Sequence, residues 1–65
     1  MEQKIKRLSE LRDQLLRLRN DDGLVTGVTF NTLAGDISVM RKETALMLID
    51  VMIGDLQQQI NYLTQ

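Results

Sequence analysis

The chain has 65 residues, so it forms one domain at most, and a protein of this size buries too little surface to be more than marginally stable. It contains no Cys and no His, which excludes disulfides, thiolate metal sites and the usual general base, and leaves self-association as the remaining means of stabilisation. The hydrophobic content of 43% with a net charge of −1 predicts a folded chain, and the absence of a long apolar run predicts a cytoplasmic protein without membrane contact.

The charge is unevenly distributed. Residues 1–19 carry six basic and three acidic side chains, whereas residues 20–65 carry two basic and six acidic ones. The near-neutral total therefore combines a first segment of net charge +3 with a remainder of net charge −4. We expect these segments to attract each other, either within one chain or between subunits.

Residues 2–20 predict a first helix. Its apolar stripe consists of leucines spaced alternately three and four residues apart, Leu8, Leu11, Leu15 and Leu18. Basic residues near its end suit the helix dipole, and Asn20 and Gly23 predict where the helix stops.

Residues 21–36 predict a loop that is longer than two packed helices require. The stretch LVTGVTF within it is compatible with a short extended piece or with a tight turn at Thr26–Gly27. Long loops in compact domains are often functional, so residues 24–35 and the start of the next helix are the best binding candidates. The candidate partner-binding or ligand-binding residues are Thr26, Thr29, Phe30, Asn31, Thr32, Arg41 and Lys42.

Residues 37–63 predict a second helix, with Asp36 as its N-cap. One apolar seam runs through Val39, Leu46, Ile49, Ile53, Leu56, Ile60 and Leu63. A second apolar set lies beside it, Ala45, Met47, Leu48, Val51 and Met52. The helix is therefore apolar around most of its circumference between residues 45 and 53, which is more than a surface helix needs.

These elements predict an all-α fold in which residues 1–65 form a single helical hairpin. One partner helix can cover only one seam, so the surplus predicts a homo-oligomer, most simply a dimer of hairpins that forms a coiled-coil-like four-helix bundle. The expected oligomer interface is Leu46, Met47, Ile49, Met52, Ile53, Leu56 and Ile60. Gly54 either allows two backbones to approach closely or is merely tolerated in the helix.

Charged residues give little sign of chemistry. Asp50 interrupts an apolar run, and it either marks the solvent face or pairs with Arg12 or Arg19. The acidic residues Asp21, Asp22 and Asp36 offer oxygen ligands, but their spacing matches no calcium loop, and a solvated turn is the simpler interpretation. We expect no metal, no cofactor, no catalytic residue and no enzyme activity. Scattered basic side chains in an acidic chain argue against nucleic acid as a partner.

The sequence therefore predicts a small protein-interaction module that docks on a larger protein. In its length, its charged leucine-rich start and its hairpin plan, the chain resembles small bacterial or phage regulators that bind one target protein, and this resemblance implies a regulator or inhibitor. An alternative is an oligomeric binder of a small phosphate-bearing, nucleotide-like ligand, held by loop hydroxyls, free helix N–H groups, Arg41 and Lys42. A third interpretation is a purely structural coiled-coil adaptor.

Overall fold

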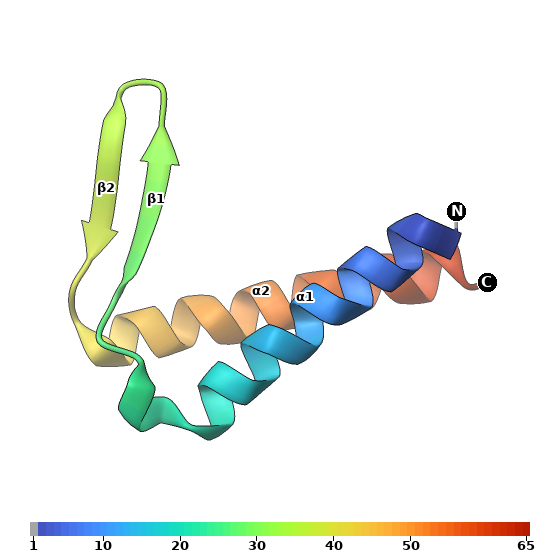
Figure 1. The fold of residues 1–65 in the computed structure, drawn as a ribbon, viewed down its shortest axis with the longest axis horizontal. Coiled ribbons are helices and arrows are strands. Elements are labelled where there is room, and N and C mark those ends of the chain that lie inside the picture. Colours follow the sequence, from blue (N-terminus) through green and yellow to red (C-terminus); the bar gives the residue numbers. More distant parts are fainter. Residues whose placement is uncertain (1) are drawn as a thin grey trace.

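The computed structural model describes residues 2–65, apart from the side chain of Asp22. Its elements are helix α1 (Glu2–Asn20), the 3-10 turn η1 (Asp22–Leu24), strands β1 (Val28–Thr32) and β2 (Gly35–Val39), and helix α2 (Lys42–Leu63). The two helices lie side by side with both termini at the same end, and the β-hairpin projects from the opposite end (Figure 1). The molecule is therefore L-shaped, with extents of 37 × 31 × 15 Å.

Helix α1 confirms the predicted first helix over residues 2–20. The predicted all-α fold class is wrong. Residues 28–39 form a two-stranded antiparallel sheet, because apolar and polar residues alternate with a period of two on both sides of a turn. Helix α2 consequently begins at Lys42 and not at residue 37. Asp36 is not its N-cap, since it pairs with Asn31 in the sheet, and Arg41 occupies the N-cap position without a side-chain hydrogen bond. The structure describes one chain, so the predicted oligomer stays a prediction.

A compact turn joins the two strands. The Thr32 hydroxyl accepts a hydrogen bond from the Ala34 amide at 3.1 Å and donates one to the Gly35 carbonyl. Gly35 has a φ of +122°, a conformation that side chains disfavour and glycine adopts readily. The turn residues thereby set the register in which Phe30 lies opposite Ile37.

The core is small and lies mainly between the two helices. Of the described hydrophobic residues, those that are buried are Val25, Ala45, Ile49, Leu56 and Ile60. Spacings of four and seven residues put the four α2 members on one face. Helix α1 meets this face with half-buried side chains, Ile5, Leu8, Leu15 and Leu16. Its inward stripe is thus rotated from the predicted one, and Leu11 and Leu18 remain 46% and 39% exposed.

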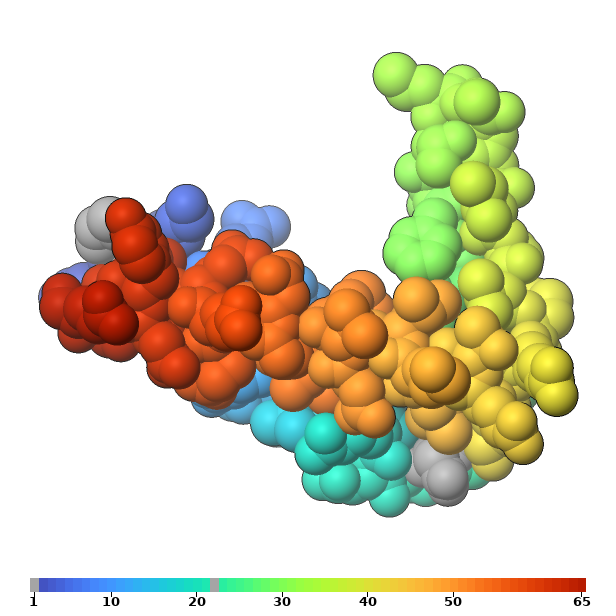
Figure 2. All heavy atoms as spheres, turned by 180° about the vertical axis from the view of Figure 1, so that it is seen from behind, coloured from blue at the N-terminus to red at the C-terminus, as the bar shows by residue number. Residues whose placement is uncertain are grey.

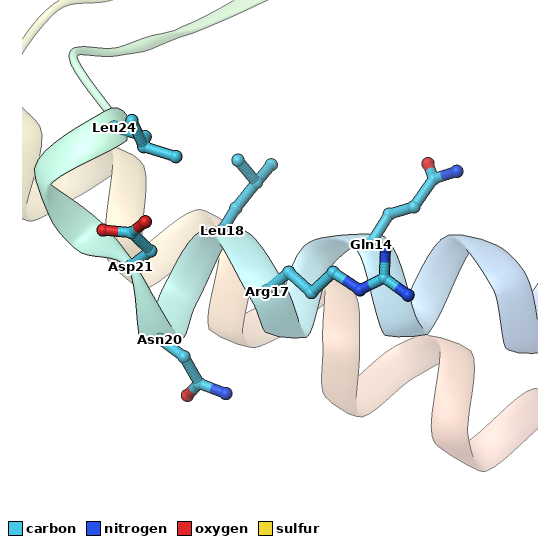
Figure 3. Close-up of a pocket in the computed structure, with 6 residues that line it drawn as sticks. All are labelled: Gln14, Arg17, Leu18, Asn20, Asp21 and Leu24. Atoms are coloured by element: carbon cyan, nitrogen blue, oxygen red, sulfur yellow. The ribbon is translucent and has the colours of Figure 1, made fainter.

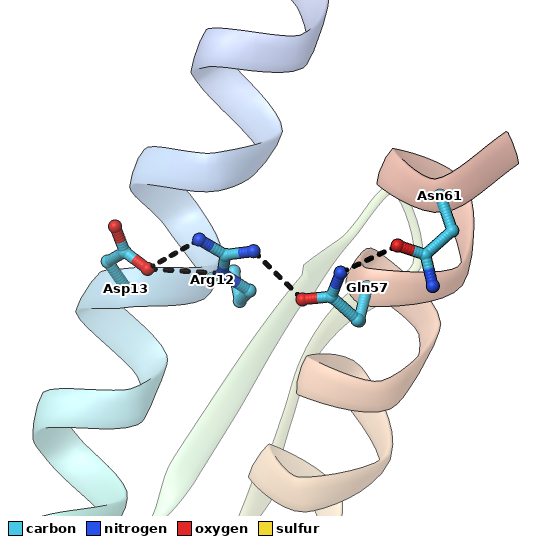
Figure 4. A network of polar contacts seen from close by, with 4 residues as sticks. All are labelled: Arg12, Asp13, Gln57 and Asn61. Carbon is cyan, nitrogen blue, oxygen red and sulfur yellow. Dashed lines mark hydrogen bonds and ion pairs between the residues drawn. The ribbon is translucent and has the colours of Figure 1, made fainter. Parts of the chain in front are cut away.

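Polar contacts also join the helices. Arg12 donates to the Gln57 side-chain carbonyl at 2.8 Å and forms an ion pair with Asp13 at 3.0 Å, and Gln57 in turn donates to Asn61 (Figure 4). Arg19, rather than Arg12, pairs with Asp50 at 2.9 Å, as one of the two predicted partners. Both side chains of that pair are about half exposed, and exposed ion pairs are worth only about 0–1 kcal/mol.

Gly27 provides a test of how the hairpin joins the helices. A Cβ atom at this position would lie 2.7 Å from the Val39 carbonyl oxygen and 3.3 Å from the Met40 Cα atom, both in the backbone. We expect Gly27→Ala to lower the free energy of unfolding by about 1–3 kcal/mol, as overpacking does. That loss should lower the thermal midpoint by roughly 4–8 °C for each kcal/mol.

Gly23→Ala is the matched control, because a Cβ there meets nothing within 4 Å. Thermal denaturation followed by circular dichroism measures both variants. Equal midpoints for Gly27→Ala and Gly23→Ala would contradict the close approach at the base of the hairpin.

Candidate functional site

The β-hairpin has one polar and one apolar face. Alternate residues of a strand point to opposite sides, and paired residues share a side. The polar face carries Thr29 and Ser38, whose hydroxyl oxygens lie 3.1 Å apart, together with Asn31 and Asp36. The opposite side, termed here the apolar hairpin face, consists of Val28, Phe30, Ile37 and Val39.

Only the base of the apolar hairpin face is covered by the chain itself. Val28 packs against the buried cluster of Val25, Ala45 and Ile49. Farther out, Phe30 is 39% exposed and Ile37 is 59% exposed, and the hairpin stands clear of the helices (Figure 2). A two-stranded hairpin is at best marginally stable by itself, so its apolar face is expected to require a cover.

An apolar depression of about 310 Å³, termed here the elbow notch, lies where the hairpin leaves the helices. It is lined by Leu15, Leu18, Leu24, Val25, Thr26, Gly27, Val28, Ile49 and Met52. Because Val28 belongs both to this depression and to the apolar hairpin face, the two form one continuous surface. A volume of this size is at the lower end of the range of binding pockets, about 300–1,000 Å³.

A second open depression, of about 570 Å³, lies at the end of α1 (Figure 3). Its lining residues are Gln14, Arg17, Leu18, Asn20, Asp21 and Leu24. Leu18 and Leu24 line both depressions and point to the same side of the chain (Figure 3). Arg17 and Asp21 add a guanidinium group and a carboxylate to this lining, with the carboxylate on the Leu24 side and the guanidinium directed toward Gln14 (Figure 3).

The predicted binding residues do not converge on one place. Thr29 and Asn31 lie on the polar hairpin face, Phe30 lies on the apolar one, and the Thr32 hydroxyl is engaged in the turn. Thr26 lines the elbow notch. Arg41 and Lys42 lie at the other end of β2 from the turn, about 20 Å away at the rise of an extended chain. The structure therefore assembles no pocket for a phosphate group from this set.

The predicted acidic ligands are similarly dispersed. Asp36 lies in β2, Asp21 follows α1, and the side chain of Asp22 lies outside the described residues. Within residues 2–65 as described, there is no group of three His, Cys, Asp or Glu residues that could hold a metal ion.

Most of the predicted oligomer interface is used inside the chain. Ile49, Leu56 and Ile60 are buried, and a second group packs against the core, Leu46, Met52 and Ile53. Only Met47 of that set is widely exposed, at 68%. The exposed apolar residues that the sequence reasoning did not single out as site residues include Leu24, Ile37 and Val51. Strand alternation was the signal that could have identified Ile37.

Comparisons with known proteins add no functional assignment. No family model, no curated protein and no solved structure matches the chain. None of the helices in the described part of the chain is sufficiently long and apolar to cross a membrane. Inference about function therefore depends on the surfaces described above.

Substitutions distinguish residues of the apolar hairpin face and the elbow notch from residues of the core by their cost in stability. Phe30→Ala and Leu24→Ala remove side chains that are 39% and 69% exposed, and we expect them to cost about 1–2 and less than about 1 kcal/mol of unfolding free energy, respectively. Ile49→Ala removes a side chain that is 3% exposed and should cost about 2–5 kcal/mol. Urea denaturation measures all three. A cost for Phe30→Ala as large as that for Ile49→Ala would show that Phe30 is needed for folding.

Proposed function

We propose that the protein is a self-associating protein-interaction module that docks on a larger protein through the apolar hairpin face and the elbow notch. The observation that supports this most is the continuous apolar surface that begins in the notch and extends outward over Phe30 and Ile37. Solvent contact at such a surface is unfavourable, and exposed apolar patches commonly mark protein-binding sites. We propose action in the cytoplasm.

The energetics favour an apolar anchor from the partner. Burial of apolar surface contributes about 25 cal/mol per Å², so covering roughly 300 Å² would contribute about 7 kcal/mol before the costs of association. Side chains on a rigid, paired backbone lose less conformational freedom on binding than side chains on a mobile loop. The paired strands therefore lower the entropy cost of binding through the apolar hairpin face.

The charge distribution indicates what should flank that anchor. Arg17 and Asp21 line the depression at the end of α1 with opposite charges, whereas residues 1–19 as a whole have a net charge of +3. We propose a partner segment with apolar side chains bordered by carboxylates, since complementary charge speeds association and selects the partner. A module of this kind regulates or inhibits by occupying a surface of its target. The phosphate-ligand alternative gains no specific support, because its residues do not converge.

Two pairs of hairpin variants test the proposal. Phe30→Asp and Ile37→Asp place a charge on the apolar hairpin face, whereas Thr29→Asp and Ser38→Asp place one on the polar face of the same strands, each opposite an uncharged residue. A partner is first identified by cross-linking to the wild-type protein in its host and is then purified. We expect calorimetric titration to show affinity lost by about 30-fold or more in the apolar-face variants, the size of a hot-spot effect.

The polar-face variants should bind within a few-fold of wild type. Circular dichroism of all four variants establishes that each remains helical. Equal losses on both faces, or no loss on either, would contradict docking through the apolar hairpin face.

A further inference from the structure

The face of α2 that points away from α1 carries an uncharged stripe. With about 100° between successive residues, the side chains opposite to buried Ile49 and Leu56 fall on one line. This outer stripe consists of Thr44, Met47, Val51, Gly54, Gln58 and Asn61, spaced alternately three and four residues apart. Met47 and Val51 are each 68% exposed, and Tyr62, which flanks the stripe, is 76% exposed.

Gly54 lies in the middle of the outer stripe, where the folded chain gives no reason for a glycine. A Cβ added at this position meets nothing within 4 Å, so no neighbour in the chain excludes a side chain. Glycine is nevertheless much less favourable than alanine in a helix interior. A missing side chain does have a use if another backbone approaches at this point.

We infer that a second copy of this chain packs its outer stripe against this one, antiparallel, with the two Gly54 residues at the crossing. The inference deepens the self-association in the proposed function and rests on it. Spacings of three and four residues form the seam along which paired helices pack. The contact is isologous, since each copy offers the same stripe to the other.

Charge favours one direction of this contact. Asp50 and Asp55 lie on opposite flanks of the outer stripe, so a parallel pair would bring Asp50 of each copy near Asp55 of the other, on both sides of the contact. The antiparallel pair brings only the two Asp55 residues close, on one side of the crossing, and leaves the two Asp50 residues about 12 Å apart along the helix axes. Opposed helix dipoles also favour the antiparallel direction. The stripe itself carries no charge that would repel an identical stripe.

The stripe is long enough for a stable contact. From residue 44 to residue 62 it spans about 27 Å at the rise of an α-helix. The whole chain exposes 5268 Å², so a contact of about 600 Å² per copy would cover roughly one ninth of its surface. Exposed Met47, Val51 and Tyr62 supply the apolar part of this contact.

Sedimentation equilibrium tests the surface. The wild-type chain should be dimeric at micromolar concentration, and Val51→Lys and Gly54→Leu should each weaken the dimer at least tenfold. Leu33→Lys is the matched control, because Leu33 is fully exposed at the hairpin turn and lies outside the stripe. Circular dichroism at high concentration checks that each variant keeps its helices.

Gly54→Ala distinguishes two interpretations of Gly54: that it lies where two helices cross, or that it is merely tolerated in the helix. Alanine favours the helix, so it should raise the stability of the isolated chain while it weakens the dimer by crowding the crossing. An unchanged dimer constant in both Gly54→Ala and Gly54→Leu would overturn this surface. If those variants remain dimeric, self-association through another surface still stands. A wild-type monomer would overturn self-association, whereas partner docking is judged separately by the hairpin variants.

Cysteine cross-linking tests the direction, because the chain has no Cys of its own. Met47 and Asn61 each lie seven residues from Gly54, on opposite sides of it. In the antiparallel pair, a mixture of Met47→Cys and Asn61→Cys proteins should form mixed disulfides, since bridging requires Cα atoms within about 7 Å. Met47→Cys alone should not cross-link rapidly. Rapid cross-linking of Met47→Cys alone, without mixed disulfides, would overturn the antiparallel arrangement.

Discussion

The packing of one face of α2 against α1 is the contact on which the rest of the structure depends. Ala45, Ile49, Leu56 and Ile60 form this face, and Val25 extends the core toward the hairpin. Burial of these side chains, rather than the exposed ion pair of Arg19 and Asp50, supplies the main stabilising free energy between the helices. The core is small, so a modest loss of apolar burial affects the whole chain.

The same contact determines where the hairpin starts. Val25 is buried directly after η1, and Gly27 passes so close to the Val39 carbonyl that a side chain there would force the backbone to shift. The strands therefore leave the helices at a fixed point, with Val28 against the core and Phe30 beyond it. Outside that point Phe30 and Ile37 are exposed, and a two-stranded sheet by itself is only marginally stable.

The sequence predicted the helices better than it predicted the hairpin. Leucine spacing together with Asn20 and Gly23 identified the bounds of α1. Val39 fits a helical seam as well as it fits a strand, and Asp36 is a favourable N-cap residue by type. The prediction therefore places residues 37–39 of β2 in the helix. The turn Leu33–Ala34–Gly35 also lacks the Asn-Gly or Asp-Gly pair that most clearly signals a hairpin.

The sequence predicts only part of the candidate site, because the rest depends on how the elements pack together. Phe30 was singled out, and it does lie on the apolar hairpin face. Which apolar side of α2 faces α1 is decided by the packing of both helices, and periodicity alone could not assign it. Ile49 belongs to the predicted seam and Met47 to the second apolar set, and the sequence places both at the oligomer interface, yet one is 3% and the other 68% exposed.

The two proposed surfaces share no residue, and this separation has a physical consequence. The outer stripe of α2 runs along the helix, whereas the apolar hairpin face lies on a segment that projects from its beginning. A dimer formed through the stripe would leave both hairpins available. Two linked binding faces hold a repetitive or symmetric target more tightly than one, because the second contact forms at a high effective concentration. Weak docking by each hairpin would then suffice for stable occupancy of such a target.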